Sequence, residues 1–408
     1  MAITVSTDPA RPAGAGVSKR AERRALGVAS GAHVLHDGYT DLIWVALPIW
    51  QAEFGLSYAA VGLLRTIFSG TMATLQIPAS RLAERIGGGT VLAIGTALAG
   101  LCYCLAGVGD GVVWLVAALL IGGLGAATQH PIGSALVARA FAGPRSLAAL
   151  GTYNFAGDIG KVLLPGLATA MILVMPWRPA YGLLGLIGVA AAVAIYWLTP
   201  RFAPERPAVK AVADEAKGGA SGARLGAGFR VLLLLGIVDS TSRGGFFVLL
   251  PFILIGKGAS VATAGFALTL VFIGGAAGKL ALGWLGGWLG TIPTICITKL
   301  LTAAGMFAIL VLPIEFVLVL LPFFGIALNG VTTVTYGSVP VLVTPEQRTH
   351  AFSVFYTGTL GAGAISPAAS GLVGDLIGIP GALIVVAVLT LATIPLAFVL
   401  KGRMMRPG

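Results

Sequence analysis

Long apolar stretches separated by short polar breaks run along almost the whole chain. Each is long enough for an α-helix to cross the hydrocarbon core of a bilayer, which takes about 20 residues. Runs such as 112–127 and 384–400 are continuously apolar, whereas strands of a membrane β-barrel alternate polar and apolar positions. The pattern predicts an all-α membrane protein with twelve transmembrane helices, at 28–52, 58–83, 90–108, 112–140, 146–175, 180–199, 229–255, 260–286, 291–312, 316–342, 347–374 and 379–400.

An internal repeat relates the two halves of the chain. Six pairs of identical residues share one offset of 203 positions: Pro48 and Pro251, Gly55 and Gly258, Gly62 and Gly265, Gly87 and Gly290, Arg145 and Arg348, and Tyr153 and Tyr356. Parallel repeats of six spans, related by an axis along the membrane normal, are typical of major facilitator transporters. The repeat therefore predicts two pseudo-symmetric six-helix bundles, at 28–199 and 229–400.

Composition agrees with a lipid environment and marks the remaining segments. Hydrophobic residues make up 57% of the chain and charged residues only 10%, with a mean hydropathy of +0.95, against about 25% charged residues in a soluble domain. Residues 200–228 are rich in Pro, Ala, Gly and charges, which indicates a solvated cytoplasmic linker. We expect a disordered cytoplasmic tail at 1–27, without a cleavable signal, and a short cytoplasmic tail at 401–408.

The net charge of +11 follows the membrane topology. With the amino terminus inside, 19 of the 26 basic residues fall in inside segments or at the inside ends of the spans, 5 lie deeper within spans, and only Arg178 and Lys257 lie in outside loops. This positive-inside asymmetry predicts a multi-pass protein of the cell inner membrane with both termini in the cytoplasm. No soluble module gathers basic and aromatic residues, so we expect no nucleic-acid partner. Three cysteines, Cys102, Cys104 and Cys296, have no metal or redox spacing and are interpreted as packing residues.

Ionisable residues inside the spans are the first candidates for a functional site, because they are costly in lipid and normally face a wet cavity or a partner. The first span carries His33, His36, Asp37 and Asp41. Because His33, Asp37 and Asp41 are spaced four residues apart, they lie on one stripe of the helix. Two close carboxylates repel when both are ionised, which favours proton binding by one of them. The alternative is that these residues anchor helix contacts by hydrogen bonding.

Two oppositely charged pairs lie in later spans: Asp158 with Lys161, and Asp239 with Arg243. They are either neutralised structural pairs or switchable partners, in which a proton on the acid releases the base to hold an anionic substrate. The first and seventh spans are equivalent in the repeat, so their acids are expected to face each other across a central cavity.

Three further cations lie within spans. Arg65 is a candidate for contacting an anion or locking an outer gate. Lys279 lies nearer the cytoplasmic end and is expected to snorkel, and Lys299 is expected on a lipid-facing helix in a structural role.

The fourth span contains His130 followed by Pro131, and the proline is expected to bend the helix. The histidine is either a packed hydrogen-bond donor or a proton-exchanging group. Three of the four histidines are intramembrane, which leaves open a metal site formed by His33, His36, Asp37 and His130.

At the end of the second span, Ser80-Arg-Leu-Ala-Glu84-Arg85-Ile-Gly87 is similar to the major facilitator signature loop. Glu84 replaces the usual Asp, and Ser80 the first glycine. The equivalent segment 283–290 has lost both charges. The resemblance implies that gating by Glu84, Arg85 and Gly87 belongs to the amino-terminal half.

Three segments resemble the fosmidomycin resistance protein family of drug exporters: His33-x-x-x-Asp37; Gly123-x-Gly125 leading to His130-Pro131 and Ser134; and Asn154-Phe155-x-Gly157 leading to Gly160 and Pro165. All three lie in the amino-terminal half. The resemblance implies twelve helices and proton-driven export of small, often anionic or phosphonate-like compounds. Arg65, Lys161 and Asp41 depart from that family pattern, which indicates a different and more acidic substrate.

Enzymes and ATP-driven pumps are poor fits. Gly278-Lys279 resembles the end of a phosphate-binding loop, but the glycine required at 273 and the hydroxyl residue required at 280 are absent. No loop carries the Ser/His/Asp or metal-ligand spacing of a hydrolase. We therefore predict a monomeric secondary transporter in the lipid bilayer, with no cofactor other than the proton gradient, that exchanges protons for a small organic anion or drug by alternating access. The alternatives are a proton-coupled importer of an organic anion and a divalent metal transporter that uses the histidine cluster.

The expected roles divide the candidate residues into three groups. Proton coupling is assigned to Asp37, Asp41, Asp239 and His130. Substrate binding is assigned to His33, His36, Arg65, Asn154, Asp158, Lys161 and Arg243, with gating at the signature loop.

Overall fold

A computed structural model describes residues 18–141, 144–200 and 225–404, and within these ranges the secondary structure is helical, without a β-strand. The amino-terminal half contains α1 (Lys19–Phe54), α2 (Tyr58–Ile86), α3 (Gly88–Val108), α4 (Val112–Ala126), α5 (Gln129–Ala140), α6 (Pro144–Ile172) and α7 (Trp177–Leu198). The carboxy-terminal half contains α9 (Ala227–Gly256), α10 (Val261–Leu289), α11 (Thr291–Val311), α12 (Ile314–Ser338), α13 (Arg348–Leu391) and α14 (Thr393–Met404), with two 3-10 turns at Val339–Val341 and Pro345–Gln347.

Nine helical stretches in the described ranges are long and apolar enough to cross a membrane, and the more polar α1 and α2 are not among them. Two helices depart from the one-span, one-helix prediction. The predicted span 112–140 is divided into α4 and α5 by a break after Ala126. The predicted span 347–374 and the first part of 379–400 run together in α13, which is kinked where Gly378 has φ +80°, and the rest of 379–400 lies in α14.

The helix ends extend further than predicted. The expected tail at 1–27 is wrong for residues 19–27, which form the first turns of α1: the hydroxyl of Ser18 accepts from the N–H of Ala21 at 3.2 Å, and buried Glu22 pairs with Arg145 at 2.6 Å. The last helix, α14, also extends to Met404, beyond the predicted span 379–400. Most of the predicted linker, 201–224, lies outside the described residues, as do 1–17 and 405–408.

Repeated glycines occupy equivalent turns in the two halves. Gly55 and Gly258 have φ of +60° and +95°, and Gly87 and Gly290 have φ of +94° and +84°. A positive φ favours glycine because it has no Cβ. The offset of 203 therefore relates turns with the same backbone requirement.

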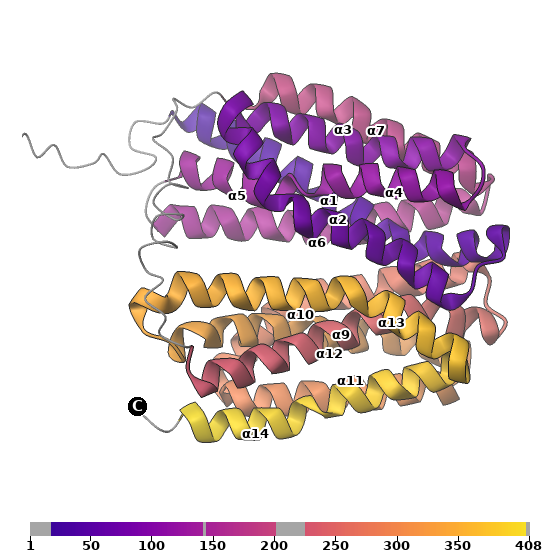
Figure 1. Ribbon diagram of the computed structural model, residues 1–408, viewed down its shortest axis with the longest axis vertical. Helices are drawn as coiled ribbons and strands as arrows, with labels where there is room; N and C mark the ends of the chain where they lie inside the picture. The colour runs from indigo at the N-terminus through magenta and orange to yellow at the C-terminus, as the bar shows by residue number, and fades with distance from the viewer. Residues whose placement is uncertain (1–17, 142–143, 201–224, 405–408) are drawn as a thin grey trace, which may run out of the picture.

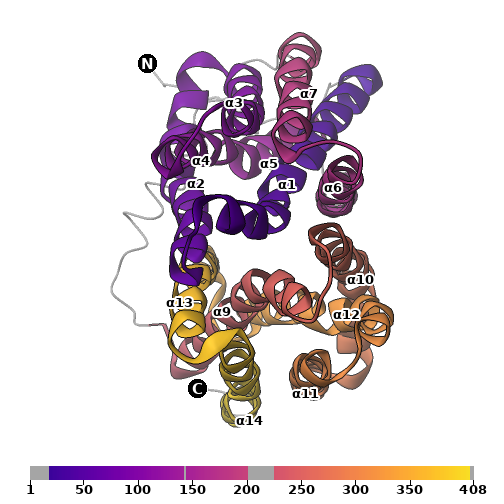
Figure 2. The same ribbon diagram turned by 90° about the vertical axis from the view of Figure 1, so that its right-hand side faces the viewer.

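Helices α1–α7 lie together on one side of the molecule and α9–α14 on the other (Figure 1). Viewed from the end in Figure 2, α2 lies beside α13 and α6 beside α10. At the α2–α13 contact, the carboxylate of Asp375 accepts hydrogen bonds from the N–H groups of Tyr58 and Ala59 at 2.8 and 2.9 Å. This end of the molecule, where α1 turns into α2, is therefore held closed by a contact between the halves.

Candidate functional site

The carboxylate of Asp37 is the centre of a polar cluster between α1 and α6. One oxygen, Oδ1, lies 3.3 Å from Nε2 of His33 and 3.7 Å from Nε2 of His36. The other, Oδ2, lies 3.2 Å from the ammonium of Lys161 on α6. Asp37 is only 7% exposed, so these neighbours replace water as the partners of its charge.

Two glycines of α6 make room for this cluster. A Cβ on Gly157 would lie 2.6 Å from Oδ2 of Asp37 and 2.8 Å from Nε2 of His33. Gly160 packs against the backbone carbonyl of Val34, so a side chain there would push the helices apart. The small residues of the Asn154-to-Pro165 segment thus bring α6 close enough for Lys161 to reach Asp37.

The environment of His33 fixes where its protons lie. Its Nδ1 is 2.8 Å from the backbone carbonyl of Tyr153, and a carbonyl oxygen only accepts, so Nδ1 carries a hydrogen. Nε2 is buried, faces Asp37 and makes no hydrogen bond within the described chain. One additional proton between Nε2 and the carboxylate therefore changes the charge of the pair.

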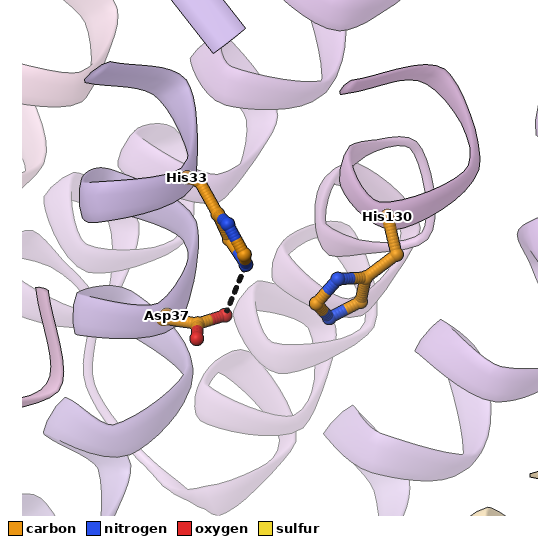
Figure 3. Close-up of side chains that lie close together, drawn as sticks. All are labelled: His33, Asp37 and His130. Carbon is orange, nitrogen blue, oxygen red and sulfur yellow. Dashed lines mark ion pairs between the residues drawn. The ribbon is translucent and has the colours of Figure 1, made fainter. Parts of the chain in front are cut away.

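His130 completes a three-residue group with His33 and Asp37, whose ligand atoms lie within 4.8 Å of one another (Figure 3). Its ring is edge-on to His33 and His36, with centroids 5.3 and 4.8 Å apart. The group has the donor types for a transition metal. The ammonium of Lys161 on the same carboxylate opposes a divalent cation, because it already neutralises the charge that would attract one.

The structure confirms the interruption expected from Pro131, which lies one turn before the proline, at the carbonyl that the proline ring cannot bond. The helix breaks at Ala127 and Thr128, and Pro131 sits in the first turn of α5, where its missing N–H is tolerated. The break places His130 at the start of α5 and faces it toward α1.

Asp158 links the amino-terminal cluster to the other half of the chain. Its Oδ1 lies 3.5 Å from the ammonium of Lys161, as the spacing predicted, and 2.5 Å from that of Lys279 on α10. The expectation that Lys279 snorkels away is therefore wrong. Asp158 lies between the two cations because α6 packs against α10 across the two halves.

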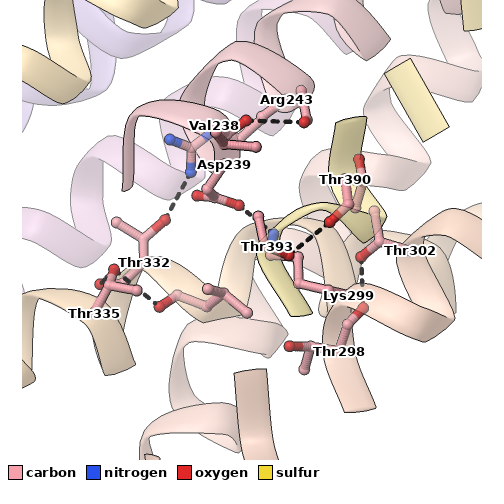
Figure 4. A network of polar contacts seen from close by, with 12 residues as sticks. Val238, Asp239, Arg243, Thr298, Lys299, Thr302, Thr332, Thr335, Thr390 and Thr393 are labelled. Carbon is pink, nitrogen blue, oxygen red and sulfur yellow. Dashed lines mark hydrogen bonds and ion pairs between the residues drawn. The ribbon is translucent and has the colours of Figure 1, made fainter. Parts of the chain in front are cut away.

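In the carboxy-terminal half, Asp239 pairs with Lys299 rather than with Arg243 (Figure 4). Lys299 is 1% exposed and its ammonium donates to the Asp239 carboxylate, so the prediction of a lipid-facing Lys299 is wrong. Arg243 instead donates to the hydroxyl of Thr332 at 2.7 Å. In the described chain it forms no ion pair.

A cavity of about 140 Å³ lies beside Arg243. Among the described residues its charged lining residues are Asp239 and Arg243, and the other lining residues are Gly236, Ser240, Thr332, Thr335, Tyr336, Phe355, Tyr356, Thr359 and Leu360. The cavity thus combines one guanidinium with hydroxyl groups and aromatic rings.

The other predicted site residues form no ion pair with these two clusters in the described chain. Arg65 is buried over the ring of Trp44, 4.5 Å from its centroid, and its Nε and Nη1 have no hydrogen-bond partner in the described ranges. The carboxylate of Asp41 accepts from Nε1 of Trp44 at 3.0 Å, and within the described ranges it forms no ion pair with a basic residue. Asn154 is exposed on α6.

The signature residues form a helix end and not a loop. Glu84 and Arg85 are exposed in the last turn of α2, which ends at Gly87. Neither makes an ion pair within the chain as described. Lys299, Thr332 and the tyrosines of the cavity were missed as site residues, although a lysine inside a continuous apolar stretch is itself a signal for a buried partner.

Comparison with known families agrees with this helical architecture. The model of the Major Facilitator Superfamily matches residues 29–231 and again 232–407. The chain belongs to the Major Facilitator Superfamily. It is accordingly a multi-pass membrane transporter and not an enzyme.

Solved major facilitator structures share the fold. A bacterial homologue of the human lysosomal transporter Spinster, in an inward-facing and unoccupied conformation, has a TM-score of 0.78 at 16% identity and covers 95% of this chain and 98% of its own. A POT family transporter in complex with 5-aminolevulinic acid has a TM-score of 0.73 at 14% identity, covering 94% and 97%.

Relatives found by sequence similarity align with a smaller share of the chain than these solved structures do. The fosmidomycin resistance protein of Escherichia coli is 30% identical over 180 residues, 42% of each chain. The probable L-galactonate transporter of the same bacterium is 28% identical over 148 residues, 36% of this chain and 33% of its own. The matches thus span well under half the length of these relatives, and they support the resemblance to the fosmidomycin resistance family.

Proposed function

We propose that the protein exchanges protons for a small organic anion by alternating access across the cell inner membrane. The observation that carries the proposal is the buried carboxylate of Asp37, held between the imidazole of His33 and the ammonium of Lys161. Its charge state depends on one proton, and the cluster is connected to the opposite half through Asp158 and Lys279.

Protonation of Asp37 would change the contact between the halves. A neutral Asp37 no longer attracts Lys161, whose ammonium then relies on Asp158, already 3.5 Å away. The carboxylate of Asp158 then pairs more strongly with Lys161, and this weakens its ion pair with Lys279 of α10. A proton at α1 thereby biases the equilibrium between two arrangements of the halves.

The charged groups that face this site come from four helices, and each contributes to its proton affinity. They are His33 and His36 of α1, His130 of α5, Lys161 and Asp158 of α6, and Lys279 of α10. We place proton coupling at Asp37, with Asp41, Asp239 and His130 as further candidates.

We further propose the complete arrangement of twelve spans in two six-helix bundles, at 28–199 and 229–400. The termini and the linker would lie in the cytoplasm, and the protein would act as a monomer. The basic residues of the inside segments support this orientation.

The relatives support export of an anionic compound. Two of them are a fosmidomycin resistance protein and a multidrug resistance protein MdtL of Shigella flexneri, 23% identical over 175 residues, and another is a probable transporter of the anion L-galactonate. Export in exchange for protons fits resistance, and a cavity beside Arg243 fits an anion.

The proposal is tested with purified protein in proteoliposomes and two labelled probes, L-galactonate and fosmidomycin. An antiporter accumulates a probe in vesicles with an acidic lumen, because protons leaving the vesicle drive the solute inward, and a protonophore abolishes the accumulation. Accumulation only with an alkaline lumen would reverse the coupling to symport. Flux of neither probe, or flux indifferent to the pH gradient, would contradict the proposal.

A further inference from the structure

The positive charges of the two clusters are not equally available to a ligand. Between α1, α6 and α10, the two ammonium groups of Lys161 and Lys279 are matched by the two carboxylates of Asp37 and Asp158. This cluster is balanced, so an anion entering it would have to displace a carboxylate. Arg65 has no ion pair in the described chain, but it is only 6% exposed, with its guanidinium packed over the ring of Trp44.

The cluster in the carboxy-terminal half carries one positive charge in excess. Asp239, Lys299 and Arg243 bring one negative and two positive charges, a net of +1 among the described residues. A buried charge without an opposite charge is costly. One negative charge on a ligand in the adjoining cavity of about 140 Å³ would restore balance there.

Arg243 is available because another cation holds Asp239. The two residues lie one turn apart on α9, a spacing at which opposite charges ordinarily pair. Lys299 of α11 reaches Asp239 from the side away from the cavity and is not one of its lining residues. Figure 4 shows the result: the guanidinium of Arg243 points toward Thr332, and the carboxylate of Asp239 toward Lys299.

We propose that Arg243 binds the anionic group of the substrate, and that Lys299 is a positioning residue that keeps Arg243 free by holding Asp239. The inference rests on the proposed transport of an organic anion and assigns its binding group. The guanidinium suits a carboxylate or phosphonate, which it contacts through parallel N–H donors.

The remaining lining residues define the rest of the ligand. The rings of Tyr336, Phe355 and Tyr356 and the side chain of Leu360 offer flat apolar surface, and threonine hydroxyls offer hydrogen bonds. The ligand class is therefore a small monoanion that carries an aromatic or similarly flat apolar group.

The test measures binding to full-length purified protein by calorimetry, with phenylacetate as the anionic probe and neutral phenylacetamide as its isosteric control. Wild-type protein is expected to bind phenylacetate saturably and at least tenfold more tightly than phenylacetamide. Arg243→Gln is expected to abolish that preference. Equal binding of both probes, or no saturable phenylacetate binding, would overturn the assignment.

The role of Lys299 is tested by comparing a single variant that removes its charge with a double variant that also removes the charge of Asp239. Lys299→Met leaves Asp239 free to capture Arg243, so phenylacetate affinity is expected to fall at least tenfold although no cavity residue has changed. Removing both charges, with Asp239→Asn added, frees Arg243 again and is expected to restore affinity to within about threefold of wild type. A merely structural role for Lys299 predicts no such rescue.

Lys257→Met is the matched control, because the ammonium of Lys257 donates to the backbone carbonyls of Leu310 and Leu312 and not to a carboxylate. It is expected to bind phenylacetate like wild type. Wild-type affinity in Lys299→Met, or a monodisperse double variant that stays unable to bind, would overturn the positioning role. If these binding results hold while both transport probes fail to move, the proposed transport function alone is wrong.

Discussion

The contact that closes one end of the molecule makes a quantitative prediction. Asp375, three residues before the kink of α13 at Gly378, caps the start of α2 through the N–H groups of Tyr58 and Ala59. These donors have no partner within their own helix. The proposed alternating access requires this end to open, and the cap is lost when the two halves separate there.

Asp375→Ala should therefore destabilise the closed arrangement alone. Loss of an N-cap costs about 1 kcal/mol, with a range of about 0.5–2 kcal/mol, which shifts a two-state equilibrium about fivefold and at most about 30-fold toward the open arrangement. Ser57→Ala is the matched control, because Ser57 caps the same helix end from within its own half, through Ala60 at 3.2 Å.

The assay is a spin-label distance measurement at this end of the molecule. Labels at the exposed positions Val113 of α4 and Glu315 of α12 report the separation of the halves. Asp375→Ala is expected to increase the population at the longer distance, and Ser57→Ala is expected to leave the ratio near that of wild type. Identical distance distributions for Asp375→Ala and wild type, or an equal shift in the control, would refute the reasoning.

Three further predictions follow from the packing of the two clusters. Gly157→Ala places a methyl group against the carboxylate of Asp37, so proton-driven flux should fall about tenfold or more. Gly151→Ala is the control: the space around Gly151 is open, so this variant should transport normally in the same vesicle assay. Lys299→Met removes the buried partner of Asp239 and leaves Arg243 as its replacement, so it should destabilise the protein by less than the about 3–5 kcal/mol of a buried charge left unpaired, and Asp239→Asn should restore most of the loss; equal thermal inactivation of single and double variants would argue against the pair. Lys161→Met should raise the affinity for Zn²⁺ measured by calorimetry, since it removes the ammonium that opposes a metal, and an unchanged affinity would show that this charge is not what excludes the cation.

The sequence predicted the positions of the helices better than it predicted which charged residues form ion pairs with each other. Continuous apolar runs specified where the helices lie, and the i,i+4 and i,i+3 spacings correctly brought Asp37 to His33 and Asp158 to Lys161. Spacing failed for Asp239, whose partner is 60 residues away on another helix.

Such partners depend on which helices pack together and on how each is rotated, and local periodicity does not encode this. The contact of Lys279 with Asp158, 121 residues apart, has the same origin. The break before α5, by contrast, was predictable from Pro131, because a proline disrupts the helix at the carbonyl four residues before it, here that of Ala127.

The central claim is that a proton at Asp37 drives movement of the substrate. It is tested most directly by comparing wild type with Asp37→Asn in vesicles with an acidic lumen, using the probe that wild type transports. The variant is expected to lose accumulation driven by the pH gradient while still exchanging labelled for unlabelled probe at equal pH. Gradient-driven accumulation by Asp37→Asn at the wild-type rate would contradict the account.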